Sequence, residues 1–158
     1  MRVSVVLCAH TMDRYDAVVE ATESILGQTY DDTELVFVSD GDEAVHERFE
    51  SDYGDREDVR THCNEENVGL LESRNNGAEV ATGDVVAFID DDAVADAEAV
   101  AELVSVYEEQ DTLAAGGKMT PPWVAGRPAL PPAGFYWLGG GPPPGVADGP
   151  RGGPRAPG

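Results

Sequence analysis

Three short runs of apolar residues constrain the fold of this chain more than any other feature of its sequence. They are Val3–Ala9, Glu34–Ser39 and Asp84–Ile89. Nearly continuous apolar runs of this length predict strands that are covered on both faces, because a half-exposed strand would alternate apolar with polar residues. A shorter strand is predicted at Val59–Cys63, and a fifth at Leu113–Met119.

Segments with helical spacing separate these strands. Helices are predicted at 13–28, 43–51, 68–82 and 96–110. Asp13 is placed to cap the first of them. In the third, Leu70, Leu71 and Ala78 are expected to face inward, and Gly83 stands where a C-terminal cap glycine belongs. Strands that alternate with helices predict an α/β domain, a mostly parallel sheet with helices on both faces.

The sequence changes character near residue 120. We expect an α/β domain at 1–120, a proline-interrupted segment at 121–138 and a low-complexity tail at 139–158. The tail is mostly Gly and Pro, which cannot bury enough apolar surface to build a core, so it is expected to be disordered. Two origins stay open: a natural flexible tail, or a coding sequence read in the wrong frame after about Leu138.

The formal net charge is −21, from 31 acidic and 10 basic residues. A surface this acidic is typical of proteins from a high-salt cytoplasm, where counterions screen the repulsion between like charges. An acidic protein from an ordinary cytoplasm is the alternative. Either way, nucleic acid is not expected as a partner, because phosphate backbones are bound by Lys and Arg.

The chain contains two cysteines, Cys8 and Cys63, without the spacing of a metal site. They are predicted to be reduced residues in or near the core of a cytoplasmic protein. No signal-peptide pattern opens the sequence, and no run of about 18 apolar residues is present, so neither standard secretion nor a membrane span is expected over this length.

Polar residues follow three of the predicted strands, at Ala9–Thr11, Asp40–Asp42 and Asp90–Asp92. In open parallel sheets, ligands bind beyond the carboxyl ends of the strands. Three adjacent carboxylates repel one another unless a cation is bound, and carboxylate oxygens suit Mg²⁺ or Mn²⁺. A solvated acidic loop is the alternative, which the preceding apolar strand disfavours.

A phosphate-binding glycine loop is missing from the sequence. Phosphate charge would therefore be offset by a metal and by a few cationic side chains. Arg74, in the segment E-N-V-G-L-L-E-S-R-N-N-G-A, is the best candidate. A surface arginine paired with Glu66 or Glu79 is the alternative.

Over about residues 2–119 the chain resembles family 2 glycosyltransferases of the GT-A fold. The resemblance rests on the order and spacing of V-S-V-V-L-C-A-H, S-I-L-G-Q-T-Y-D-D-T-E-L-V-F-V-S-D-G-D and E-N-V-G-L-L-E-S-R-N-N-G-A-E-V-A-T-G-D-V-V-A-F-I-D-D-D-A. It implies a Rossmann-like domain that binds a nucleotide sugar at 1–120, followed by part of an acceptor-side segment at 121–138. The acidic composition further resembles haloarchaeal members, some of which build glycans on lipid carriers.

The same resemblance implies roles for single residues. The end of the first strand, with Ala9 and His10, would line the nucleoside pocket, and Asp40 would hydrogen-bond the base or the ribose. Arg74 would lie near the base and phosphates. The triplet matches the family's D-x-D motif, with Asp90 and Asp92 as the metal ligands and Asp91 toward the ribose or a metal-bound water.

Two departures from the family pattern concern the base-binding part of the site. Ser39 replaces the first of two paired acids, and His10-Thr11 stands where Tyr-Asn is common. Neither change removes an expected metal ligand, so the departures bear on base specificity alone.

The implied activity is transfer of a sugar from a nucleoside diphosphate, with UDP favoured, to a glycan or a polyprenyl- or dolichol-linked acceptor. Mg²⁺ or Mn²⁺ would stabilise the leaving diphosphate. The protein would work in the cytoplasm, including the cytoplasmic face of the membrane, which the acceptor or a further C-terminal part would contact. We identify no catalytic base, so a non-catalytic donor-binding fragment is the alternative. A receiver-like or phosphatase-like domain is disfavoured, because no single phosphoacceptor aspartate is followed by a buried lysine.

Overall fold

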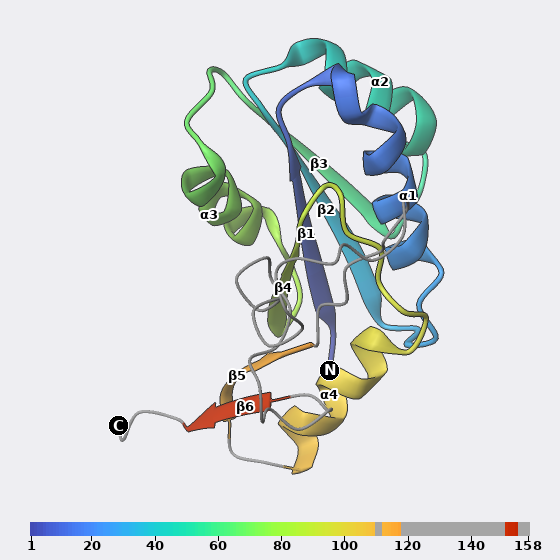
Figure 1. The fold of residues 1–158 in the computed structure, drawn as a ribbon, viewed down its shortest axis with the longest axis vertical. Helices are drawn as coiled ribbons and strands as arrows, with labels where there is room; N and C mark the ends of the chain where they lie inside the picture. The colour runs from blue at the N-terminus through green and yellow to red at the C-terminus, as the bar shows by residue number, and fades with distance from the viewer. Residues whose placement is uncertain (110–111, 118–150, 155–158) are drawn as a thin grey trace, which may run out of the picture. The chain divides into compact units, whose positions relative to one another are not determined.

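The computed structural model describes residues 1–109, 112–117 and 151–154. Two compact units divide the chain, Met1–Ala101 and Glu102–Gly158. The first unit holds a four-stranded parallel sheet, whose strands lie in the order β3-β2-β1-β4 (Figure 1). These strands are β1 (Val3–Ala9), β2 (Thr33–Asp40), β3 (Val59–Asn64) and β4 (Val85–Ile89).

Helices cover both faces of this sheet, which confirms the predicted α/β fold. The helical elements are η1 (Met12–Arg14), α1 (Tyr15–Leu26), α2 (Glu43–Tyr53) and α3 (Leu70–Val80), of which α3 packs on β1 and β2. In Figure 1, α3 lies on one face of the sheet, and α1 and α2 lie on the other.

The core has one apolar layer under each set of helices. On the α3 side, Val6, Cys8, Val36 and Val38 form a buried cluster. Gly77 brings α3 onto this layer, since a Cβ atom there would lie 2.5 Å from Val6 Cγ1. On the other side Phe37 stacks on Phe49 of α2, with ring centroids 3.8 Å apart. β1 and β2, at the centre of the sheet, are buried on both faces, as their apolar runs predict. The prediction that the strand at 84–89 is equally covered was wrong: β4 lies at an edge of the sheet and is only partly buried, as is β3 at the other edge.

The second unit contains most of α4 (Ala99–Glu109), with β5 (Thr112–Gly116) and β6 (Arg151–Pro154). β5 pairs antiparallel with β6, so the predicted fifth strand belongs to a separate two-stranded sheet. β6 also corrects the expectation that all of 139–158 lacks regular structure. Strand pairing needs only backbone groups, so a Gly-rich segment can pair without any side-chain periodicity. The remainder of that tail, and all of 121–138, lie outside the described residues.

Three local predictions about helix ends and faces were wrong. Asp13 does not cap α1: its N–H instead donates to Thr11 Oγ1, which caps η1. Leu70 and Leu71 are 52% and 77% exposed, because they form the first turn of α3, whose buried contacts begin one turn later. Gly83 does not end α3, which stops at Val80; it donates its N–H to a serine of β1 instead.

Both cysteines are free, as predicted, with Cys8 buried and Cys63 partly exposed. Within the described ranges, no helix has the length and apolar character needed to cross a membrane.

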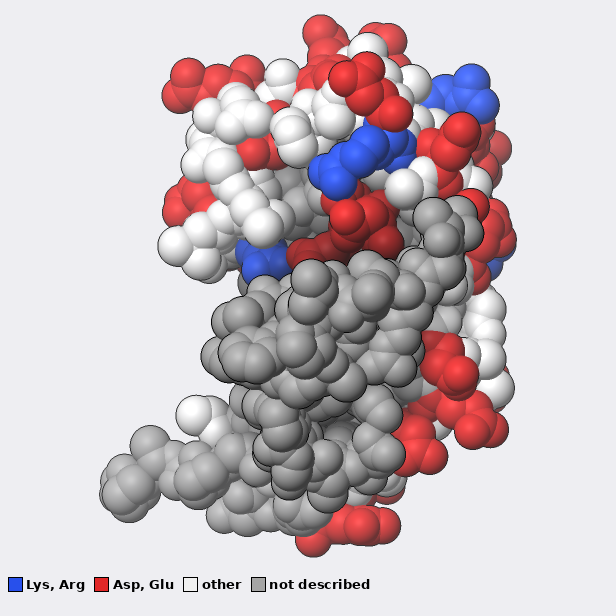
Figure 2. Space-filling model, viewed as in Figure 1, with Lys and Arg blue, Asp and Glu red and all other residues white. Residues whose placement is uncertain are grey.

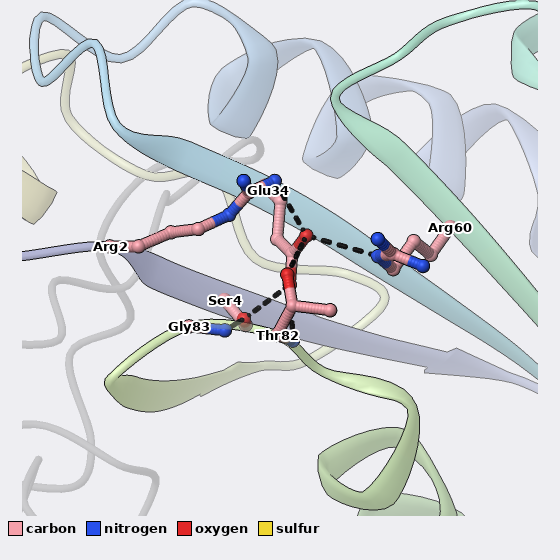
Figure 3. Close-up of polar contacts among 6 residues, drawn as sticks. All are labelled: Arg2, Ser4, Glu34, Arg60, Thr82 and Gly83. Atoms are coloured by element: carbon pink, nitrogen blue, oxygen red, sulfur yellow. Dashed lines mark hydrogen bonds and ion pairs between the residues drawn. The ribbon is translucent and has the colours of Figure 1, made fainter.

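A cluster of polar side chains closes the sheet at the amino ends of its strands. Glu34, at the start of β2, is 1% exposed and lies at its centre. Its carboxylate accepts hydrogen bonds from four residues of neighbouring segments, at distances of 2.6–3.2 Å (Figure 3). The Gly83 N–H donates to Ser4, one of these four residues. We call the whole group the Glu34 cluster; it consists of Arg2, Ser4, Glu34, Arg60, Thr82 and Gly83.

The electrostatics of Glu34 follow from these contacts. Burial alone would raise the pKa of Glu34, but hydrogen bonds from Ser4, Thr82 and Arg60 outweigh it and lower the pKa to about 2. The carboxylate is therefore ionised at any pH at which the protein works, and its acceptors are fully used by the chain itself.

Candidate functional site

The sheet topology brings two polar loops together at the carboxyl ends of the strands. β1 pairs with β2 on one side and with β4 on the other, and Leu7 lies opposite Ile89. The loops that leave β1 and β4 therefore start side by side, at the position where α/β sheets bind ligands. One loop carries His10 and Arg14, and the other carries Asp90–Asp92.

Two arginines hold the three aspartates of this edge. Arg14 Nη2 lies 2.9 Å from Asp91 Oδ2, and Arg14 Nη1 lies 3.5 Å from Asp92 Oδ2. Arg74 Nη2, from α3, lies 2.7 Å from Asp90 Oδ1. We call these five residues the Asp90–Asp92 cluster. It has three carboxylates and two cations, so one negative charge is left over.

The aspartates differ in their access to solvent. The side chain of Asp91 is 12% exposed, whereas those of Asp90 and Asp92 are 46% and 62% exposed. Burial raises the pKa of Asp91, the Arg14 guanidinium opposes the rise, and the neighbouring Asp92 charge adds to it. The cluster thus has one semi-buried carboxylate and two that can turn toward a ligand.

Arg74 is oriented by an aromatic ring as well as by Asp90. Its guanidinium carbon lies 5.7 Å from the ring centroid of Phe88, which is 49% exposed on β4. This stacking holds the planar group at the sheet edge and leaves some of its N–H donors available.

Asp40 lies at the end of β2 and is 5% exposed. Its Oδ1 accepts from Asn64 Nδ2 at 3.0 Å and from the Val68 N–H at 2.8 Å, and its Oδ2 accepts from the Gly69 N–H at 2.9 Å. Burial opposes ionisation of Asp40, but these hydrogen bonds and one from Ser73 hold its pKa below the usual value. The carboxylate therefore fixes the loop before α3.

The backbone around Asp40 depends on two glycines with positive φ. Gly41 has φ 73° and Gly69 has φ 87°. A side chain at Gly41 would also collide with the backbone of Glu66 and Asn67. Only glycine allows both the turn and this close approach.

The structure places most of the predicted site residues around the end of β1. Ala9 is buried there and His10 is exposed. Burial raises the pKa of the Cys8 thiol to about 11, and the charges of Arg74, Asp40, Asp90 and Asp91 also act on it. Ser39, the departure from the family's paired acids, donates its hydroxyl to the Asp42 carbonyl at 2.5 Å.

Sequence reasoning missed Arg14, Asn64 and Ser73. Arg14 is a basic residue five positions after the first strand in a chain with few basic residues, and that position could have identified it. Asn64 and Ser73 interact directly, with Nδ2 donating to Oγ at 2.9 Å. Asn64 falls in a sequence that is typical of a polar turn, and Ser73 is a polar residue of a predicted helix, so the burial of neither could be predicted from the sequence.

Figure 2 shows acidic side chains over much of the visible described surface, with few Lys and Arg. Within the described residues, no group of three or more His, Cys, Asp or Glu side chains is arranged to hold a metal ion. The two exposed aspartates still fit Mg²⁺ or Mn²⁺ in one respect. These hard cations often take one or two carboxylates from a protein and complete their coordination with phosphate oxygens and water.

The profile described as Glycosyl transferase family 2 matches residues 4–132. The chain belongs to glycosyl transferase family 2. It is 50% identical over 139 residues to the glucosyl-dolichyl phosphate glucuronosyltransferase of Haloferax volcanii, covering 87% of this chain and 44% of that protein. It is 29% identical to an uncharacterized glycosyltransferase of Haemophilus influenzae, over 73% of this chain and 35% of that protein. The chain thus spans less than half the length of these curated relatives.

Solved structures agree with this family fold. The structure of S. aureus TarS 1-349 in complex with UDP-GlcNAc matches with a TM-score of 0.67 and 22% identity, over 81% of this chain and 37% of that one. The mannosyltransferase PcManGT of Pyrobaculum calidifontis, in complex with GDP-Man and Mn²⁺, matches with a TM-score of 0.62 and 22% identity, over 76% and 36%. At these identities the likeness establishes the GT-A fold alone.

Proposed function

We propose that residues 1–120 form the donor-binding domain of a glycosyltransferase that takes a sugar from a nucleoside diphosphate, with a UDP-sugar favoured. One observation carries the proposal: the Asp90–Asp92 cluster lies where the strand order of a family 2 domain reverses, and two arginines already stand beside it. Carboxylates and guanidinium groups at one sheet edge are the groups needed to hold a cation and a diphosphate together.

In this proposal, Asp90 and Asp92 hold the divalent cation, and Asp91 faces the ribose or a metal-bound water. A bound Mg²⁺ or Mn²⁺ supplies a Lewis acid that stabilises charge on the leaving diphosphate. Arg74 donates to phosphate oxygens through the N–H groups that Asp90 does not use. This assignment matches the charge of the cluster, which lacks one cation.

The nucleoside lies against the end of β1 in the same proposal. Ala9 and His10 line its pocket, and Asp40 accepts a hydrogen bond from the base or the ribose through Oδ2. That oxygen already accepts the Gly69 N–H hydrogen bond. The Asp40 carboxylate is largely occupied by hydrogen bonds within the chain, so Asp40 binds the nucleoside through Oδ2 alone.

The acceptor is a glycan or a polyprenyl- or dolichol-linked molecule, and segment 121–138 begins the acceptor side. The name of the Haloferax volcanii relative, which includes a dolichyl phosphate, supports this class. Such an acceptor would bring the protein to the cytoplasmic face of the membrane. The acidic surface and this haloarchaeal relative also support work at high salt.

A second candidate function is donor binding without catalysis. The chain spans 44% of the length of the Haloferax relative, and the described residues offer no side chain that we assign as a catalytic base. An assay of sugar transfer that compares this chain with a form extended to the relative's length separates the two. Transfer by the extended form alone would favour the binding fragment.

The donor site is tested by calorimetric titration of UDP in multi-molar KCl, with and without Mn²⁺. We expect binding that needs Mn²⁺ and that falls at least tenfold in Asp92→Ala, because loss of even an outer-shell partner of a metal ligand typically costs about 10–100-fold in affinity. Asp55→Ala, which removes an exposed carboxylate between α2 and β3, is the matched control and should bind as the wild type does. A repeat with GDP tests the base. A protein that is folded by circular dichroism but binds neither nucleotide would contradict the proposal.

A further inference from the structure

Arg14 makes two unequal contacts with the acidic triplet. Its Nη2 lies 2.9 Å from Asp91, whose side chain is 12% exposed, and its Nη1 lies 3.5 Å from Asp92, which is 62% exposed. A guanidinium presents donors in a fixed plane and can bridge two carboxylates. It can also release the longer, more hydrated contact while it keeps the shorter one.

The backbone of Arg14 is fixed on both sides of the residue. Arg14 ends η1 and precedes α1, with φ −119° and ψ 23°. The turn is closed by Thr11 Oγ1, which accepts from the Asp13 N–H at 3.2 Å. The side chain of Arg14 does not cap α1, although it occupies the N-cap position, and extends to the aspartates instead. Arg14 therefore ties the acidic triplet to the start of α1.

The opposite end of α1 holds the segment that follows the triplet. Ser24 Oγ accepts from the Ala95 N–H at 3.0 Å. Gln28 donates Nε2 to the Asp96 carbonyl at 2.7 Å and accepts from the Val100 N–H at 2.9 Å. These contacts of residues 95–100 do not involve Arg14.

The triplet itself depends on the two arginines for its ion pairs. Within the described residues, Arg74 makes the ion pair of Asp90, and Arg14 makes those of Asp91 and Asp92. Loss of Arg14 would therefore free the second and third carboxylates alone.

We propose that Arg14 is a positioning residue that orders Asp91 and Asp92 before the donor binds and yields Asp92 to the cation that accompanies the diphosphate. The inference rests on the proposed function. It has a specific consequence: Arg14 competes with a cation that arrives alone, but assists a cation that arrives with UDP. In the second case the phosphate oxygens give the released N–H groups new acceptors.

The test compares Arg14→Gln, Arg14→Lys and the control Arg56→Gln in the whole chain. Arg56 pairs with Asp58 at 2.7 Å just before β3, at the amino edge of the sheet. Binding of Mn²⁺ alone is measured from the electron paramagnetic resonance signal of free Mn²⁺. Binding of UDP at saturating Mn²⁺ is measured by calorimetry.

We expect Arg14→Gln to bind Mn²⁺ alone about fivefold tighter and UDP about tenfold weaker, as removal of one nearby positive charge predicts. Arg14→Lys should fall between this variant and the wild type, since an ammonium keeps the charge but does not bridge two carboxylates. Arg56→Gln should match the wild type in both measurements. Opposite changes in the two affinities are the signature, because general damage to the fold would weaken both.

Equal affinities in Arg14→Gln and the wild type, or a parallel loss of both, would overturn the inference. If Arg14→Gln does not fold, Arg14→Lys decides, and wild-type affinities in that variant would overturn it. If the folded wild type binds neither UDP nor GDP, the proposed function fails by itself. The Mn²⁺ measurement then still tests Arg14: tighter binding in Arg14→Gln supports its hold on Asp92, and unchanged binding refutes it.

Discussion

The two edges of the parallel sheet, at the amino and the carboxyl ends of its strands, both carry clusters of carboxylates and arginines. The carboxylate of the cluster at the amino edge is buried, whereas most of those at the carboxyl edge are exposed. At the amino edge, one carboxylate, Glu34, is 1% exposed and accepts from two arginines, two hydroxyls and a backbone N–H. At the carboxyl edge, three aspartates share two arginines, and two of the three are substantially exposed. The number of donors per carboxylate thus separates a closed structural cluster from an open site.

The pKa directions express the same contrast. Hydrogen bonds outweigh burial at Glu34 and lower its pKa to about 2. At Asp91, burial outweighs the attraction of Arg14, and the pKa is raised. The first carboxylate stabilises the fold when it is charged. The second destabilises it, and a cation would reverse that effect.

The largest effect is expected from Glu34→Gln. A pKa lowered from 4.5 to about 2 corresponds to about 3 kcal/mol of free energy of unfolding at neutral pH. The amide also turns N–H donors toward the donors of the cluster. Urea unfolding in KCl measures the loss, with the exposed Glu57→Gln as control. A loss equal to that of the control would mean that the cluster is not structural.

The pH dependence of unfolding checks the same residue from another side. Glu34 has a lowered pKa, so its contribution is complete above about pH 4.5 and is lost as the pH falls toward 2. The difference in unfolding free energy between wild type and Glu34→Gln should therefore shrink across that window. A difference that stays constant from pH 6 to pH 2.5 would contradict the assigned pKa.

Asp40→Asn tests what makes a carboxylate structural: the number of hydrogen bonds that it accepts, or the end of the sheet at which it lies. Asp40 lies at the carboxyl edge, yet it accepts one hydrogen bond from Asn64 at the end of β3 and two from the N–H groups of Val68 and Gly69 in the loop before α3. We expect a loss of about 2 kcal/mol in unfolding free energy, because a buried acceptor is replaced by a group that also donates. Thermal unfolding measures it, with the exposed Asp31→Asn as control. A variant as stable as the control would show that Asp40 is not structural and behaves like the carboxylates of the Asp90–Asp92 cluster.

Gln28→Ala tests the support of the open cluster. The side chain links the end of α1 to the Asp96 carbonyl and the Val100 N–H, and its loss should cost about 1 kcal/mol. Hydrogen exchange should quicken at Val100 more than in β1. Glu20→Ala, on the exposed side of the same helix, should change neither quantity. An unchanged rate of hydrogen exchange at Val100 would show that residues 95–100 keep their structure without the Gln28 contacts.

The smallest effect, with the opposite sign, is expected from Asp91→Asn. A carboxyl group whose pKa is raised by folding lowers stability as the pH rises through that pKa, so its removal should stabilise the protein slightly at pH 7. Thermal unfolding without added divalent cation measures the change, with Asp55→Asn as control. A clear loss of stability would show that the ion pair with Arg14 outweighs the burial of Asp91.

The contrast between the edges also explains what could be predicted from the sequence. The continuous apolar run of β1 and the position of the aspartates after β4 identify the sheet and its open edge. Both signals can be recognised in the sequence, because they depend only on the spacing of apolar residues and on the order of segments along the chain. The role of Glu34 could not be predicted in this way, since its four partner residues reach it from other segments of the chain. Leu70 and Leu71 fit a helical stripe, but only the position of the sheet decides where the buried part of α3 begins.

Arg14 illustrates the same limit at the site. Its distance from the first strand places it at the correct edge, but its pairing depends on the neighbouring positions of β1 and β4. No local pattern of residues predicts the strand order β3-β2-β1-β4. The strands and the polar residues that follow them were therefore predictable, and the contacts that bridge separate segments were not.

The most direct test of the account is paramagnetic broadening of backbone amide signals by Mn²⁺ in the presence of UDP, recorded on ¹⁵N-labelled protein in KCl. We predict strong broadening at His10–Arg14 and Asp90–Ala93, and little at Ser4, Glu34 and Gly83. The open edge would then be the one that takes the cation. Broadening centred on the Glu34 cluster, or none at the carboxyl edge while UDP binds, would contradict it.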